Sequence, residues 1–122
     1  MDLNVTQPGK DSTILFLIEV ELETYGYKVL TADTSAEGLE KAAKQRPDVI
    51  ISGIKMPGID GYGLIRRIRQ TEGSADVPAI ALTGLSARAD RDKALAAGFN
   101  ACLSKPVEGE ELAVLIKKLT ER

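Results

Sequence analysis

The chain has no histidine and only one cysteine, Cys102, among its 122 residues. Without histidine it cannot form a Ser-His-Asp or Cys-His catalytic site, a His-ligated metal centre or a phosphohistidine carrier. A lone cysteine cannot form an internal disulfide, and with no histidine it cannot complete a Cys/His zinc site. These absences exclude several common enzyme and metal-binding classes.

The sequence also lacks a strong charge of one sign and any long apolar run. Its 16 Lys and Arg residues and 18 Asp and Glu residues give a formal net charge of −2, so no basic surface indicates nucleic acid or an anionic membrane. The longest apolar run, residues 14–18, is much shorter than the roughly 20 residues that span a bilayer. Its acidic neighbours are also unlike those of a secretory signal. We therefore expect a cytoplasmic protein that contacts neither nucleic acid nor membrane.

What is present is a regular alternation of β-rich runs and helical patterns, without a repeat or linker, so we predict a single domain over residues 1–122. Strands are predicted at residues 27–31, 49–52, 77–83 and 101–104, and helices at about 35–46, 61–71, 87–97 and 108–120. Such alternation predicts a parallel sheet covered by helices on both faces.

The amino-terminal region is harder to assign. A strand at residues 14–18 would leave only about seven residues before the strand at Tyr27, fewer than the dozen or so that a parallel crossover needs. We therefore predict a helix over residues 13–25, capped by Asp11 or Ser12. Residues 3–6 must then form the first strand, although this segment is short and contains Asn4.

Several motifs occur together in a characteristic order. They are "RPD" at 46–48, "MPGIDGYGLIRRIR" at 56–69, "VPAIALTG" at 77–84, "ALAAGF" at 94–99 and "LSKP" at 103–106. On these residues the chain resembles the receiver domain of two-component response regulators. Its motifs are most similar to those of receivers attached to hybrid sensor kinases. The resemblance extends over nearly the whole chain.

The resemblance implies a flavodoxin-like α/β/α sandwich with a five-stranded parallel sheet in the order 2-1-3-4-5. It also implies an active pocket at the carboxyl ends of the strands, in agreement with the general rule for such sheets. In working receivers an aspartate after the third strand accepts a phosphoryl group from a phosphohistidine. That aspartate and a pair of acids after the first strand hold Mg²⁺.

By the same resemblance, this chain keeps one half of the pocket and loses the other. Thr83 matches the hydroxyl residue after the fourth strand, and Lys105, followed by Pro106, matches the phosphoryl-binding lysine. Gly53, however, falls on the phosphoacceptor position. The half that binds oxygen atoms is thus retained, and the acceptor is lost.

The acid pair and the position that couples to Thr83 also differ from the family pattern. Counting back from Gly26 places the acid pair on Gly9 and Lys10, with Asp11 as a candidate remnant. The position three before the lysine is often aromatic in the family and is Cys102 here. We interpret Cys102 as a small, buried apolar residue.

Phosphoryl transfer requires an in-line nucleophile and a cation over the developing charge. Gly53 offers neither a nucleophile nor a ligand, and Lys10 would repel a dication. Ser52 should point to the opposite face of its strand. We therefore expect no cofactor, lost or weak Mg²⁺ binding and no enzymatic activity: a pseudo-receiver that signals by protein contacts.

Other interpretations remain open. The chain could be a working receiver with a substitute acceptor such as Asp11, or a receiver whose acceptor aspartate was changed to glycine on purpose. A third interpretation is a flavodoxin-like small-ligand binder, which the low aromatic content of 4% disfavours.

We expect the partner to be a signalling protein, namely a histidine kinase, a hybrid kinase or an effector. Its predicted docking face comprises helix 87–97, strand 101–104 and helix 108–120. We interpret Arg66, Arg67 and Arg69 as a solvated helix face and Gly58 and Gly61 as turn glycines.

Overall fold

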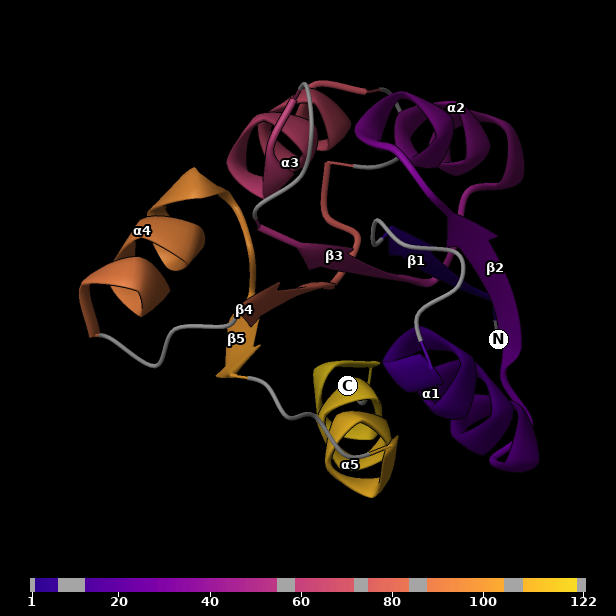
Figure 1. The fold of residues 1–122 in the computed structure, drawn as a ribbon. Coiled ribbons are helices and arrows are strands. Elements are labelled where there is room, and N and C mark those ends of the chain that lie inside the picture. Colours follow the sequence, from indigo (N-terminus) through magenta and orange to yellow (C-terminus); the bar gives the residue numbers. More distant parts are fainter. Residues whose placement is uncertain are drawn as a thin grey trace.

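The computed structural model describes residues 2–6, 13–54, 59–71, 75–83, 88–104 and 109–120, and the side chains of 13–18, 88–90 and 109 are outside the description. Strands and helices alternate along the chain (Figure 1). In chain order they are β1 (Asp2–Thr6), α1 (Thr13–Thr24), β2 (Lys28–Ala32), α2 (Ser35–Gln45), β3 (Val49–Gly53), α3 (Gly61–Arg69), β4 (Ala79–Thr83), α4 (Arg88–Ala97), β5 (Ala101–Ser104) and α5 (Gly109–Thr120).

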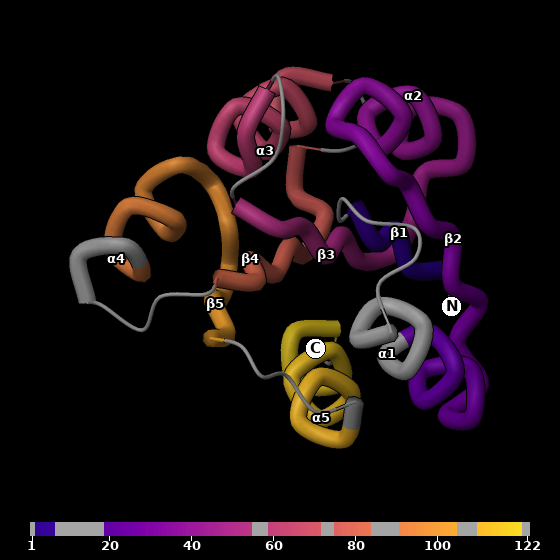
Figure 2. Tube along the Cα trace, in the orientation of Figure 1, coloured from indigo at the N-terminus to yellow at the C-terminus, as the bar shows by residue number. Residues whose placement is uncertain are grey.

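The strands form one parallel sheet in the order β2-β1-β3-β4-β5, which confirms the predicted fold class. Helices α1 and α5 pack together on one face, and α2, α3 and α4 cover the other (Figure 2). Each face has its own apolar layer. Leu3, Val5 and Ile51 point toward α1 and α5, whereas Ile50 and Ala81 point toward the other three helices.

The first strand is confirmed, and it lies beside the centre of the sheet. β1 pairs with β2 through Asp2↔Lys28 to Thr6↔Ala32, and with β3 through Leu3↔Val49 to Thr6↔Ser52. The polar residue that made this strand a poor candidate is buried but satisfied. Asn4 donates its side-chain N–H to the Gly38 carbonyl at 3.2 Å and accepts a hydrogen bond from the Thr6 hydroxyl at 3.0 Å.

Several helix and strand ends follow directly from local chemistry. Thr34 caps α2 by accepting a hydrogen bond from the Glu37 amide at 3.1 Å. β4 begins at Ala79, two residues later than predicted. Pro78 has no N–H to donate to a neighbouring strand and lies outside β4. Its carbonyl oxygen accepts a hydrogen bond from the Ile50 amide at 2.9 Å. The predicted caps of α1, Asp11 and Ser12, lie outside the described residues.

Candidate functional site

The carboxyl ends of β3 and β4 form the centre of the candidate site. β3 ends at Gly53, which is paired with Leu82, and β4 ends one residue later at Thr83, which is paired with Ser104. The structure therefore brings the predicted acceptor position and the predicted hydroxyl residue to the same edge of the sheet. Thr83 is 9% exposed, so it is almost buried at that edge.

Gly53 is an ordinary strand residue with respect to its backbone. It lies within β3, all of whose residues are buried, and its φ angle is not in the left-handed region. Nothing in this backbone conformation requires glycine. The lost carboxylate is therefore a chemical difference at position 53 and not a consequence of strand geometry.

Gly61 closes one side of the site by an unusually tight backbone contact. A Cβ atom at this position would overlap the Gly53 carbonyl oxygen and lie 2.8 Å from the Ile54 Cα atom. The Gly61 amide donates to the Ile54 carbonyl at 2.7 Å. The interpretation of Gly61 as a turn glycine is therefore wrong: it is the first residue of α3, and glycine is needed for close approach to β3.

Asp60, the described carboxylate nearest in sequence to this contact, is used to begin α3. Its Oδ1 atom accepts a hydrogen bond from the Gly63 amide at 2.9 Å, as an N-cap residue does. The Asp60 carboxylate therefore serves as a helix cap in this structure. Ser52 is buried, and its hydroxyl donates to the Gly53 carbonyl at 2.8 Å.

Cys102 lies on β5 beside Ala81 and is half-buried against the apolar layer under α2, α3 and α4. Its packing agrees with the interpretation of a small apolar residue. The remaining predicted pocket residues, Gly9, Lys10, Asp11, Lys105 and Pro106, lie outside the described residues. Their roles stay predictions.

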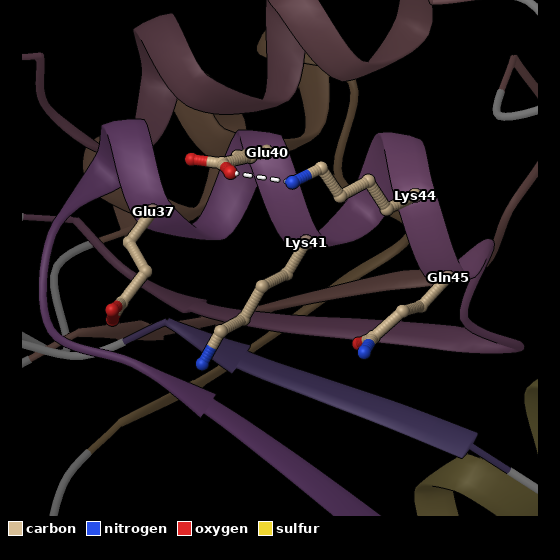
Figure 3. Close-up of a pocket in the computed structure, with 5 residues that line it drawn as sticks. All are labelled: Glu37, Glu40, Lys41, Lys44 and Gln45. Atoms are coloured by element: carbon tan, nitrogen blue, oxygen red, sulfur yellow. Dashed lines mark hydrogen bonds and ion pairs between the residues drawn. The ribbon is translucent and has the colours of Figure 1, made fainter.

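A second polar feature lies away from the strand ends, on α2. Glu37, Glu40, Lys41, Lys44 and Gln45 line an open groove of about 310 Å³ between α2 and the edge of the sheet (Figure 3). Lys41 Nζ donates to the Thr31 carbonyl at 2.6 Å, and Glu37 accepts from the Asp33 amide at 2.7 Å. Both side chains are therefore bound to backbone groups at the end of β2 or just after it, and the groove resembles a solvated helix surface.

The Glu40–Lys44 ion pair on the same helix has a nitrogen–oxygen distance of 2.8 Å. The hydrogen bond and charge of Lys44 lower the pKa of Glu40, and the same interactions with Glu40 raise the pKa of Lys44. Both side chains are largely exposed, so solvent screens the pair strongly.

Arg69 was not recognised from the sequence as a structural residue. Arg66 and Arg67 are exposed, as predicted, but Arg69 is half-buried at the end of α3. Its guanidinium binds backbone and side-chain oxygens of the segments before β4 and before β5. The available signal was its position four residues after the buried Ile65, on the same helix face.

Comparison with known proteins agrees with this architecture. The family model described as "Response regulator receiver domain" matches residues 10–117. The chain is 36% identical to an uncharacterized 14.6 kDa protein of Leptolyngbya boryana, over 97% of this chain and 88% of that protein. It is 35% identical to the transcriptional regulatory protein AfsQ1 of Streptomyces coelicolor, over 92% of this chain but only 48% of AfsQ1. The chain thus spans about half the length of that regulator.

Two solved structures are similar over nearly their whole length. The receiver domain of the sensor histidine kinase PA1611 from Pseudomonas aeruginosa, which has a magnesium ion in its active-site cleft, superposes with a TM-score of 0.88 at 30% identity, covering 98% of this chain and 96% of that one. The chemotaxis protein CheY4 of Vibrio cholerae superposes with a TM-score of 0.89 at 27% identity, covering 97% of each chain. The chain belongs to the response regulator receiver domain family.

Proposed function

We propose that this receiver domain is a pseudo-receiver, which acts in two-component or phosphorelay signalling through protein–protein contacts and accepts no phosphoryl group at the usual position. The observation that carries the proposal is Gly53. It occupies the carboxyl end of β3 at the edge of the sheet that also carries Thr83, and it has no side chain that could act as a nucleophile.

The same position explains why we expect Mg²⁺ binding to be lost or weak. A magnesium site depends on carboxylate oxygens from the protein, and glycine at position 53 removes one of them. The assignment of the acid pair to Gly9 and Lys10 would remove the other two and add a positive charge. Together these changes remove both the acceptor and the cation that phosphoryl transfer requires.

The proposed docking face comprises α4, β5 and α5. Two large apolar side chains on it are exposed: Leu95 of α4 is 41% exposed and Val114 of α5 is 64% exposed. We expect a histidine kinase, a hybrid kinase or an effector to bind there. Without covalent modification at Gly53, the domain would be controlled by binding equilibria alone.

No helix in the described part of the chain is long and apolar enough to cross a membrane. Our proposal of a cytoplasmic location rests on the composition and on the signalling role.

Incubation with Mg²⁺ and a small acyl phosphate, followed by intact-mass measurement, tests the proposal. We expect no adduct with the mass of a phosphoryl group. The matched positive control restores all three carboxylates through Gly53→Asp, Gly9→Asp and Lys10→Asp. An adduct on the unmodified chain that Asp11→Asn removes would instead support a working receiver with a substitute acceptor.

A further inference from the structure

Helices α1 and α5 lie side by side against one face of the sheet, and their outer sides point away from it (Figure 1). Leu22 of α1 and Leu112 of α5 are buried between these helices and the sheet. Val20 precedes the first of these leucines by two residues and Val114 follows the second by two, which is about 200° around a helix. The valines are accordingly 43% and 64% exposed. Each helix therefore presents a valine on its outer side.

The end of α1 carries negative charge beside its exposed valine. Glu21 and Glu23 are exposed, and the last turn of α1 contains no basic residue. The carboxyl end of a helix is its negative pole, so glutamates there do not stabilise α1. Neither of them forms an ion pair with another described residue. The stability of the helix therefore gives no reason for this acidic turn.

The end of α5 carries the opposite charge. Lys117 and Lys118 are exposed in its last turn and lie three and four residues after Val114, on the same side of the helix. The acidic residues of α5, Glu110 and Glu111, are in its first turn. Neither lysine forms an ion pair with another described residue. The positive charge of α5 is therefore confined to one end of its outer side.

The acidic turn and the basic turn lie at the same edge of the sheet, because α1 and α5 run in the same direction. α1 leads from the carboxyl end of β1 to the amino end of the parallel strand β2, and α5 follows the carboxyl end of β5. A two-fold axis parallel to both helices and between them would place α1 of one copy over α5 of a second copy. The acidic turn of each copy would then meet the basic turn of the other.

We propose that the outer surface of α1 and α5 is a homodimer interface, occupied by a second copy of the chain. Charge complementarity favours a second copy, because a partner with charge of one sign would attract one of these helices and repel the other. Val114 also belongs to the proposed docking face, so the dimer would cover one of the two exposed apolar side chains of that face. The inference goes beyond the proposed function and holds whether or not the chain accepts a phosphoryl group.

Sedimentation velocity of the whole chain, over a range of protein concentrations at low salt, tests the interface. We expect a reversible equilibrium between monomer and dimer that weakens as salt is added, because salt screens exposed charges. Lys117→Glu together with Lys118→Glu makes both turns acidic, and Glu21→Lys together with Glu23→Lys makes both turns basic. Each pair of substitutions should raise the dissociation constant of the dimer roughly tenfold or more, because like charges then face each other.

An equal mixture of the two variants is the decisive sample. In a heterodimer each acidic turn of one variant meets a basic turn of the other in both contacts, so the mixture should dimerise although each variant alone does so weakly. A restored dimer also shows that both variants fold. Arg66→Glu together with Arg67→Glu is the matched control, since it makes the same change of charge at exposed residues of α3, on the other face of the sheet. This control should leave the dissociation constant unchanged.

A chain that is monomeric at every concentration would overturn the proposal. A dimer that both charge reversals leave intact would do the same, as would a mixture that associates no more tightly than the separate variants. Loss of the dimer through Leu95→Glu alone would assign self-association to the side of α4 and would also overturn it. The pseudo-receiver proposal is tested separately by the mass of the phosphoryl adduct, so the failure of one proposal is distinguishable from the failure of the other.

Discussion

At Gly53 the absence of a side chain removes a possible nucleophile and metal ligand. At Gly61 the absence of a side chain allows the backbone of α3 to approach β3 closely. The φ angle of Gly53 is not in the left-handed region, and the consequence of glycine there is the loss of a possible nucleophile and ligand. Gly61 begins α3 against the Gly53 carbonyl, where a Cβ atom would overlap backbone atoms that cannot move independently. A glycine in the sequence does not reveal which of these situations applies.

Gly61→Ala is therefore expected to destabilise the domain by about 1–3 kcal/mol, the usual cost of forcing an extra group into a packed site. Urea denaturation measures the change. Gly63→Ala is the matched control on the same helix turn, because its Cβ atom would meet the Ile59 side chain, which can move, at 2.6 Å. A loss of stability at Gly63 equal to that at Gly61 would contradict the backbone-contact explanation.

At the scale of elements, three helix ends in the described part of the chain have a specific chemical cause. Thr34 begins α2 and Asp60 begins α3 by accepting hydrogen bonds from amides, while Gly98 ends α4 with the turn that Arg69 binds. Thr34 was recognisable because a capping residue before an apolar helical pattern is a local signal. The capping role of Asp60 was not recognised, since the sequence around it also matched the loop of the receiver motif.

Asp60→Ala should reduce the free energy of unfolding by about 1 kcal/mol, because the first turn of α3 loses its cap. Asp60→Asn should retain most of the stability, since asparagine caps helices about as well. Thermal or urea unfolding of both variants provides the measurement. Equal losses in the two variants would mean that the charge of Asp60 matters more than its hydrogen bond to Gly63.

The Glu40–Lys44 pair allows a prediction about pH. Lys44 lowers the pKa of Glu40, so any stability from the carboxylate is present above its unfolded-state pKa and is lost as pH falls through the lower, folded-state value. Lys44→Gln should raise the Glu40 pKa toward its ordinary value, which an NMR titration of the carboxyl group detects. Because both side chains are largely exposed, the unfolding midpoint at neutral pH should not change measurably.

At the scale of the whole molecule, the alternation of strands and helices was enough to predict a parallel sheet, and the receiver motifs supplied the strand order. The position of β1 followed from chain length, since a strand at residues 14–18 left too little chain for a crossover. Arg69 could not be assigned in this way. Two of its partners, Gly98 and Asn100, are 29 and 31 residues away in sequence and reach it only after α3, α4 and β5 have packed.

The location of the candidate site at one edge of the sheet was predictable from the sequence, but its tight contacts were not. Gly53 and Thr83 reach the same edge of the sheet because parallel strands align their carboxyl ends, which the register confirms. The contact between Gly61 and Gly53 depends on the distance between α3 and β3, which no local pattern encodes. The fold therefore follows from patterns along the chain, and the tight contacts around the site follow from packing.

The central claim is that this receiver accepts no phosphoryl group at Gly53. The most direct test is a pair of amide NMR spectra, recorded with and without Mg²⁺ plus beryllofluoride, which mimics an aspartyl phosphate. We predict that the signals of Gly53, Thr83 and Lys105 do not move, because no carboxylate at position 53 can bind the mimic. Saturable shifts at these residues that spread to Cys102 and α4 would contradict the account and show that another acceptor works in its place.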